Sequence, residues 1–98
     1  MESYEAYKEK MSANLKEAEA TIAQYGAKIQ EAKADAQIKL QEQYSDLSEK
    51  KRQFQQRLTE LKQGGSNAFG EVRQGVERAW GELTGALKRS SDALNNVH

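Results

Sequence analysis

Apolar side chains recur every three or four residues between positions 11 and 61. This spacing puts them on one face of an α-helix, and alternating intervals of three and four are typical of a coiled-coil seam. A β-strand is excluded, because alternation with period two never persists for more than a few residues. The pattern predicts one long helix, from about residue 3 to residue 63. Its seam residues are Met11, Leu15, Ile22, Ile29, Leu40, Tyr44, Leu47, Phe54, Leu58 and Leu61.

The seam changes its spacing near the middle of this segment. Ala32, Ala36, Leu40 and Tyr44 follow one another at three successive intervals of four. Such a stutter locally unwinds a coiled coil toward straight helices. The chain has no proline, and Gly26 is a lone weak point in helix propensity, so nothing in the sequence forces a break. We therefore expect the helix to continue through this region.

A turn and a second helix follow the long one. Gly64 and Gly65 can supply the backbone conformation that ends a helix, and residues 64–67 are predicted to form the turn. A second apolar stripe at helical spacing predicts a helix over about 68–96. Its central members are Phe69, Val76, Trp80, Leu83 and Leu87. The fold class is therefore all-α, with residues 1–98 forming a single helical hairpin of two antiparallel helices.

The two predicted helices differ in length, and this difference bears on assembly. At 1.5 Å per residue the first would extend about 90 Å and the second about 45 Å. The shorter helix would then cover only roughly residues 33–62 and leave the seam over 11–32 bare. A bare apolar stripe of that length favours association. We therefore predict a self-associating coiled-coil hairpin, a homo-oligomer and most simply a homodimer.

The composition argues against catalysis. There is no cysteine, and the one histidine is His98, so neither a thiol nucleophile nor a histidine-based metal site is available. We expect no enzymatic activity, no cofactor and no bound metal. The first residues do not follow the basic-then-apolar order of a signal peptide, and no apolar run reaches the length of a membrane span. A cytoplasmic location is the resulting expectation.

Formal net charge is zero, but the charges are unevenly distributed. Residues 1–49 hold six Lys/Arg against ten Asp/Glu, a net −4, and residues 50–98 hold nine against five, a net +4. A candidate basic patch comprises Lys50, Lys51, Arg52 and Arg57. This patch could contact phosphates, but the acidic opposite half and the missing interleaved aromatics argue against a nucleic-acid partner. A solvated helix face is the plainer interpretation.

The second predicted helix carries a family resemblance. Its residues 75–86 read Gly-Val-Glu-Arg-Ala-Trp-Gly-Glu-Leu-Thr-Gly-Ala. This run resembles the G-V-E-x-A-W-x-E-L-x-x-A tails of small bacterial coiled-coil proteins linked to stress response. The resemblance covers this helix well and the rest of the chain only through its helical layout. It implies a helical hairpin of the cytoplasm with a stress-related role, and it assigns no active-site residues.

Two functional hypotheses follow. In the first, the chain is a non-enzymatic structural or interaction protein that self-associates through its seam and Trp80. In the second, it is an amphipathic protein that opens at Gly64 and Gly65 and lays its apolar faces on a lipid surface or on an unfolded client protein. The four glycines within the second predicted helix, which weaken that helix, favour the second hypothesis. The low overall hydrophobicity favours the first.

Overall fold

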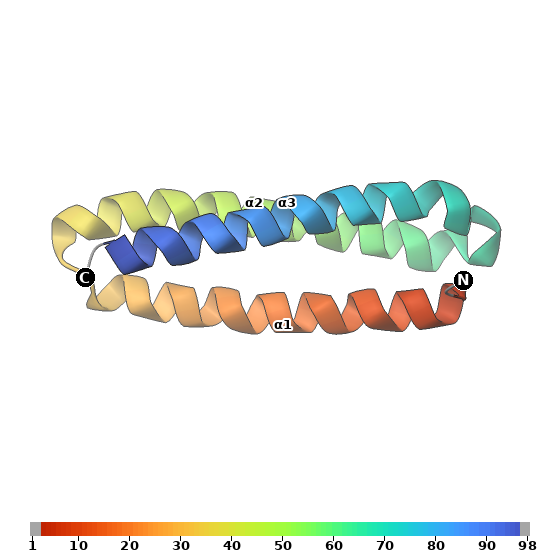
Figure 1. Cartoon of the computed structure of the whole chain (residues 1–98), viewed down its shortest axis with the longest axis horizontal. Coiled ribbons are helices and arrows are strands. Elements are labelled where there is room, and N and C mark those ends of the chain that lie inside the picture. Colours follow the sequence, from red (N-terminus) through yellow and green to blue (C-terminus); the bar gives the residue numbers. More distant parts are fainter. Residues whose placement is uncertain (1–2, 97–98) are drawn as a thin grey trace.

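A computed structural model describes residues 3–96 of the chain, and these residues are all-helical, as expected from the sequence. The elements are α1 (Tyr4–Glu31), α2 (Ala34–Gly64), a 3-10 turn η1 (Ser66–Ala68) and α3 (Phe69–Asn96). His98 lies outside the described residues. Figure 1 shows the three α-helices lying side by side: α1 runs from the N-terminal end to the far end, α2 returns, and α3 runs out again.

The prediction of one uninterrupted helix over 3–63 was wrong. The chain leaves the helix at Ala32 (φ −78°, ψ 158°) and Lys33 (φ −66°, ψ 154°), both in extended conformation, and re-enters it at Ala34. This break lets α1 fold back along α2 (Figure 1). At the break a few helical backbone hydrogen bonds are lost, and each would contribute about 1 kcal/mol to stability. Burial of Met11, Ile22 and Ile29 stabilises the fold by about 1.5–3 kcal/mol for each side chain. The free energy gained by burial therefore exceeds that lost by interrupting the helix.

Local sequence suits the ends of both helices at this break. Lys28 lies in the last turn of α1 and Asp35 in the first turn of α2, and both charges complement the helix dipoles. At the other end of α1, the Ser3 hydroxyl caps the helix by accepting a hydrogen bond from the backbone N–H of Ala6 at 3.2 Å. No side chain caps α2 at Lys33.

The second turn depends on two glycines, as the sequence suggests. Gly65 has φ +65°, a conformation that side chains other than glycine's rarely adopt. Gly64 is required for a different reason: a Cβ atom there would lie 2.8 Å from the Cβ of Ala68. The 3-10 turn then leads directly into α3. The pair therefore permits the tight passage from α2 to α3.

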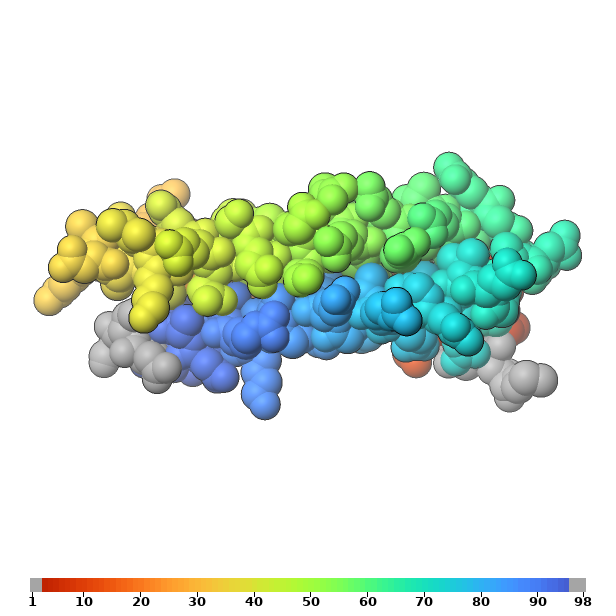
Figure 2. All heavy atoms as spheres, turned by 90° about the horizontal axis from the view of Figure 1, so that it is seen from above, coloured from red at the N-terminus to blue at the C-terminus, as the bar shows by residue number. Residues whose placement is uncertain are grey.

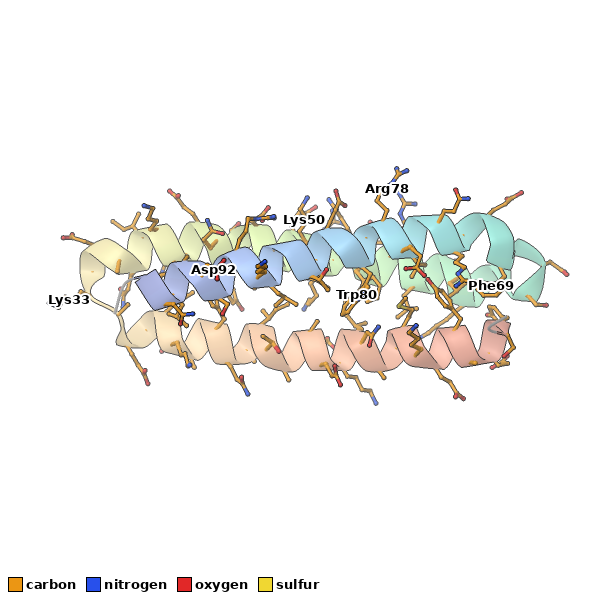
Figure 3. The ribbon with its side chains drawn as sticks, viewed as in Figure 1. Lys33, Lys50, Phe69, Arg78, Trp80 and Asp92 are labelled. Atoms are coloured by element: carbon orange, nitrogen blue, oxygen red, sulfur yellow. The ribbon has the colours of Figure 1, made fainter. Side chains whose placement is uncertain are left out.

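The three helices are not equally close. The backbones of α2 and α3 approach each other along their length, whereas α1 stands farther from both (Figure 1). Figure 2 shows α2 and α3 packed side by side, covering most of α1 in that view. Side chains fill the space between α1 and the other two helices (Figure 3). Three small residues of α3, Ala79, Ala86 and Ser90, are buried in the bundle. The molecule measures 50 × 19 × 17 Å.

One continuous apolar core runs between the helices. Among the predicted seam and stripe residues, the buried ones are Met11, Ile22, Ile29, Leu40, Leu47, Phe54, Leu58, Leu61, Val76 and Leu83. Leu15, Phe69, Trp80 and Leu87 are partly buried against this core. Tyr44 differs from the expectation, because its side chain is 36% exposed. The core lies within a single chain.

Glycine substitutions should separate the turn from the helices. Gly65→Ala forces a side chain into a left-handed backbone and should lower the free energy of unfolding by about 1–2 kcal/mol. Gly81→Ala is the matched control: it lies within α3 with open space around its added Cβ, and should raise stability by up to about 1 kcal/mol. Urea unfolding followed by circular dichroism measures both. Equal effects of the two substitutions would contradict the assigned turn.

Candidate functional site

The predicted seam of α1 is covered by the chain's own helices. Met11 is 2% exposed and Ile22 is 5% exposed, and both belong to the core shared with α2 and α3. The expectation that the seam over 11–32 stays bare was therefore wrong. Its cause is the break at Ala32 and Lys33, which doubles α1 back over the surface that α2 and α3 present.

An aromatic cluster fastens the first turns of α1. The ring of Phe69, at the start of α3, lies 5.8 Å from the ring of Tyr4 and 5.3 Å from that of Tyr7. The Tyr4 hydroxyl donates to the carbonyl oxygen of Leu61 at 3.1 Å. The Tyr7 hydroxyl donates to Oε1 of Glu77 at 2.9 Å. These contacts join α1 to both α2 and α3 at one end of the molecule.

A cation completes this cluster. The guanidinium carbon of Arg73 lies 4.7 Å from the centroid of the Tyr7 ring and 5.6 Å from that of Phe69. A guanidinium over an aromatic face is attracted by the ring's negative quadrupole. Arg73 Nε also lies 3.7 Å from Oε1 of Glu77. Burial, the largest effect, and the hydrogen bond to Glu77 together raise the pKa of Tyr7 well above its ordinary range.

A second aromatic contact fastens the last third of α1. The rings of Tyr25 and Tyr44 are stacked, with centroids 6.3 Å apart and an interplanar angle of 3°. Gly26 makes room for this contact, since a Cβ there would lie 3.2 Å from a ring carbon of Tyr44. The Tyr25 hydroxyl donates to the carbonyl oxygen of Leu40 at 3.4 Å. The glycine that the sequence marks as a weak point therefore serves a contact between α1 and α2.

Trp80 lies between α3 and α1, near the middle of the molecule (Figure 3). Its ring packs against that of Phe54 on α2, with centroids 5.1 Å apart. It is partly buried against the core. In Figure 3, Phe69 also lies in the space between α3 and α1, whereas Arg78 projects from the opposite side of α3. Trp80 is thus placed as a packing residue and as a fluorescent reporter of the core.

The candidate basic patch is largely paired with carboxylates. Arg52 contacts Glu49, its Nε lying 3.0 Å from Oε2, and Arg57 Nη1 lies 3.2 Å from Oε2 of Glu60. Lys50 Nζ lies 4.0 Å from Oε1 of Glu82 on α3. The hydrogen bond to Arg52 lowers the pKa of Glu49.

Lys51, the remaining member of the patch, is half-buried. Because the other three cations lie beside carboxylates, the patch presents no cluster of unpaired cations. Its Arg52 and Arg57 members do line a shallow polar groove with Arg78 of α3, but Glu82 lines the same groove. The carboxylates at this surface weaken the attraction for phosphate that the sequence alone suggests. The arrangement matches the plainer interpretation, a solvated and ion-paired helix surface.

A pocket of about 180 Å³ opens where all three helices meet in the half of the molecule near the α1–α2 link. Its floor includes buried Tyr25, Leu47, Ser90 and Leu94. Its rim consists of exposed residues: Thr21, Gln24 and Lys28 of α1, and Ser91 of α3. Half-buried Leu87 completes the lining. No sequence motif indicates this pocket, because it depends on α1 folding back.

Within the described part of the chain, no group of three or more Asp, Glu, His or Cys side chains could together hold a metal ion. Among residues 3–96, no helix has the length and apolar character needed to cross a membrane. The chain matches no family model, and no characterised protein or solved structure shows significant similarity to it.

The Tyr7–Glu77 hydrogen bond should have a measurable effect on stability. Tyr7→Phe removes the hydroxyl and should lower the free energy of unfolding by about 1–2 kcal/mol at neutral pH. Because the pKa of Tyr7 is raised in the folded chain, its contribution is complete below about pH 10 and is lost as pH rises above that value. The variant should therefore lose less stability than the native chain between pH 10 and pH 12.

Tyr44→Phe is the control, since the Tyr44 hydroxyl makes no hydrogen bond to a described residue. It should change stability by less than about 0.5 kcal/mol. Urea unfolding at pH 7 and at several alkaline pH values makes the comparison. Equal losses in the two variants at pH 7 would show that the Tyr7 hydrogen bond contributes nothing.

Proposed function

We propose that the chain is a non-enzymatic interaction protein in which α2 and α3 form an antiparallel coiled-coil hairpin and α1 is an exchangeable helix. In the closed chain α1 covers its own hairpin. In the associated form α1 straightens into line with α2 and covers the hairpin of a second copy. The result is a homodimer with the same buried contacts as the monomer, now made between chains.

The α1–α2 link is the observation that carries this proposal. It consists of Ala32 and Lys33, flanked by Glu31 and Ala34, and all four are good helix formers. No glycine or proline holds the link in its extended conformation, and no side chain caps α2 there. Short links of this kind are the hinges through which domain exchange occurs. The straight helix expected from the sequence is then the associated form of the same chain.

The geometry of exchange follows from the helix lengths. A continuous helix over 4–64 would be about 90 Å long, against a closed molecule of 50 Å. Each contact of α1, including Tyr4 with Leu61 and Tyr25 with Leu40, re-forms with the second chain. Straightening the link restores the backbone hydrogen bonds that the break removes. Because two chains must meet, the associated form depends on concentration.

Substituting the link tests the exchange directly. Lys33→Pro suits the closed chain, because Lys33 has φ −66° and the preceding Ala32 is already extended. The Lys33 carbonyl still accepts from the Gln37 N–H at 2.9 Å, so no described hydrogen bond is lost. A continuous helix through residue 33 would cost about 3 kcal/mol more. The variant should therefore remain monomeric at concentrations where the native chain forms dimers.

Lys33→Ala is the matched control, because it removes the same charge without restricting the backbone. It should form dimers as the native chain does. Size-exclusion chromatography with light scattering gives the mass, and small-angle X-ray scattering gives the longest dimension. Dimers of equal stability in Lys33→Pro would contradict exchange, as would a native chain that stays monomeric at millimolar concentration.

A second candidate function is binding of a lipid surface or an unfolded client protein by the opened bundle. The observation favouring it is that the backbone of α1 lies farther from α2 and α3 than these two lie from each other (Figure 1). Opening would occur at Ala32–Lys33 and expose Trp80, which packs between α3 and α1. We expect a blue shift of Trp80 fluorescence on adding anionic vesicles or a denatured client, and a smaller shift in Lys33→Pro. No shift and no co-sedimentation would remove this candidate.

We propose a stress-related role only on the strength of the C-terminal helix resemblance. The residues that carry it, from Gly75 to Ala86, include the core residues Val76, Ala79 and Leu83. These residues build the α2–α3 pair rather than a reactive site. The resemblance therefore supports the interaction function rather than adding a chemistry to it.

A further inference from the structure

The end of α2 is capped by a side chain from α1. The last four carbonyl groups of an α-helix have no partner within the helix, and those of Leu61 and Lys62 belong to this last turn of α2. The Tyr4 hydroxyl donates to the carbonyl oxygen of Leu61 at 3.1 Å and lies 3.4 Å from that of Lys62. The Gly65 N–H donates to the same Leu61 carbonyl at 3.3 Å. A residue of α1 therefore completes the end of a helix that lies far from it in sequence.

The ring of Tyr4 contacts the other side of the turn. Phe69 is the first residue of α3, and its ring lies 5.8 Å from the Tyr4 ring in an edge-to-face arrangement. Tyr4 thus bridges the turn, with its hydroxyl on the end of α2 and its ring on the beginning of α3. None of residues 62–68 is buried, so the turn has no core of its own, and the contacts of Tyr4 hold its two ends together.

The turn is weak by itself. Its internal hydrogen bonds include that from Gly65 to Leu61 and that from the Ala68 N–H to the Gly65 carbonyl oxygen at 3.3 Å. Both involve a glycine, whose backbone is the least restricted of any residue. Segments with few buried contacts and exposed backbone hydrogen bonds open locally at a low free-energy cost. Separating α2 from α3 here moves Leu61 away from Phe69, so Tyr4 cannot keep both of its contacts.

From these contacts we infer that the first turn of α1, residues 4–7, is a strap that keeps the α2–α3 turn closed until α1 leaves. Tyr4 makes the contact with the turn, and Tyr7 holds the strap down through its hydrogen bond to Glu77 of α3. The order of opening is then fixed, because α1 must leave before α2 and α3 separate at the glycine turn.

This order bears on what the opened chain presents. A lipid surface or a client protein meets the intact α2–α3 hairpin first, and separated helices only after the strap has gone. The strap needs only the closed chain, so a failure of helix exchange between copies leaves the inference standing.

Hydrogen exchange of single backbone amides tests the strap. Tyr4→Phe removes the capping hydroxyl, keeps the ring, and should speed exchange of the Gly65 and Ala68 amides about three- to tenfold. Tyr7→Phe removes a hydroxyl that contacts α3 beyond the turn. It should also speed these two amides, because it loosens the strap. NMR measures exchange on the full chain at a concentration where it is monomeric.

Tyr25→Phe is the matched control. It too removes an α1 hydroxyl that donates to an α2 carbonyl, that of Leu40 at 3.4 Å, but near the α1–α2 link. The two turn amides should keep their native exchange rates in this variant. The Gln37 amide, which donates to the Lys33 carbonyl at 2.9 Å, is the internal reference and should keep its native rate in both strap variants. Circular dichroism checks that each variant is folded.

Faster exchange of the turn amides in both strap variants, with native rates in Tyr25→Phe, supports the inference. Native rates in Tyr4→Phe would overturn it, since the turn would then open without regard to α1. An increase in Tyr4→Phe alone would also overturn it, because Tyr4 would then be a cap and not part of a strap. Equal increases at Gln37, or in Tyr25→Phe, would indicate global unfolding and contradict a local strap.

Discussion

The covering of the apolar stripe of α1 is the constraint on which the rest of the structure depends. A single amphipathic helix of this length does not persist alone in water, so its stripe must meet another apolar surface. The extended residues Ala32 and Lys33 allow the same chain to supply that surface. The gain from burying Tyr7, Met11 and the side chains that follow them exceeds the loss of a few helical hydrogen bonds. The aromatic contacts and the interhelical pocket follow from this fold.

Much of the fold can be predicted from the sequence, because the apolar pattern reports directly on buried faces. It identifies the helical class, the turn at Gly64 and Gly65, and stripe residues such as Leu47 and Val76. It does not identify the end of α1, since Glu31–Ala34 are all good helix formers. The one available signal is the stutter from Ala32 to Tyr44, where the seam changes phase at the point at which the chain turns. Two explanations fit a stutter, straight helices or a break, and only tertiary packing decides between them.

The candidate sites are less predictable because they need residues from separate helices. Charge counting alone singles out Lys50, Arg52 and Arg57, but carboxylates from α2 and α3 lie beside them. Tyr7 becomes a candidate only in the structure, through its hydrogen bond to Glu77. Ser90 does so through its place in the pocket between the helices. No local spacing brings Lys28, Leu47 and Ser90 together. The candidate sites therefore lie between helices, and the pattern of a single sequence does not show which residues of separate helices meet.

A distance within one chain tests the central claim most directly. Spin labels on Ala13→Cys and Gln56→Cys, both exposed positions in a chain without native cysteine, can be diluted in unlabelled protein and measured by double electron–electron resonance. In the closed chain the labels lie on neighbouring helices of a molecule less than 20 Å thick, and we predict a distance of about 30 Å or less at low concentration. A distance of about 65 Å, that of 43 residues in one straight helix, should grow in only as concentration rises. A distance of about 65 Å at every concentration would contradict the turn at Ala32–Lys33 and the account built on it.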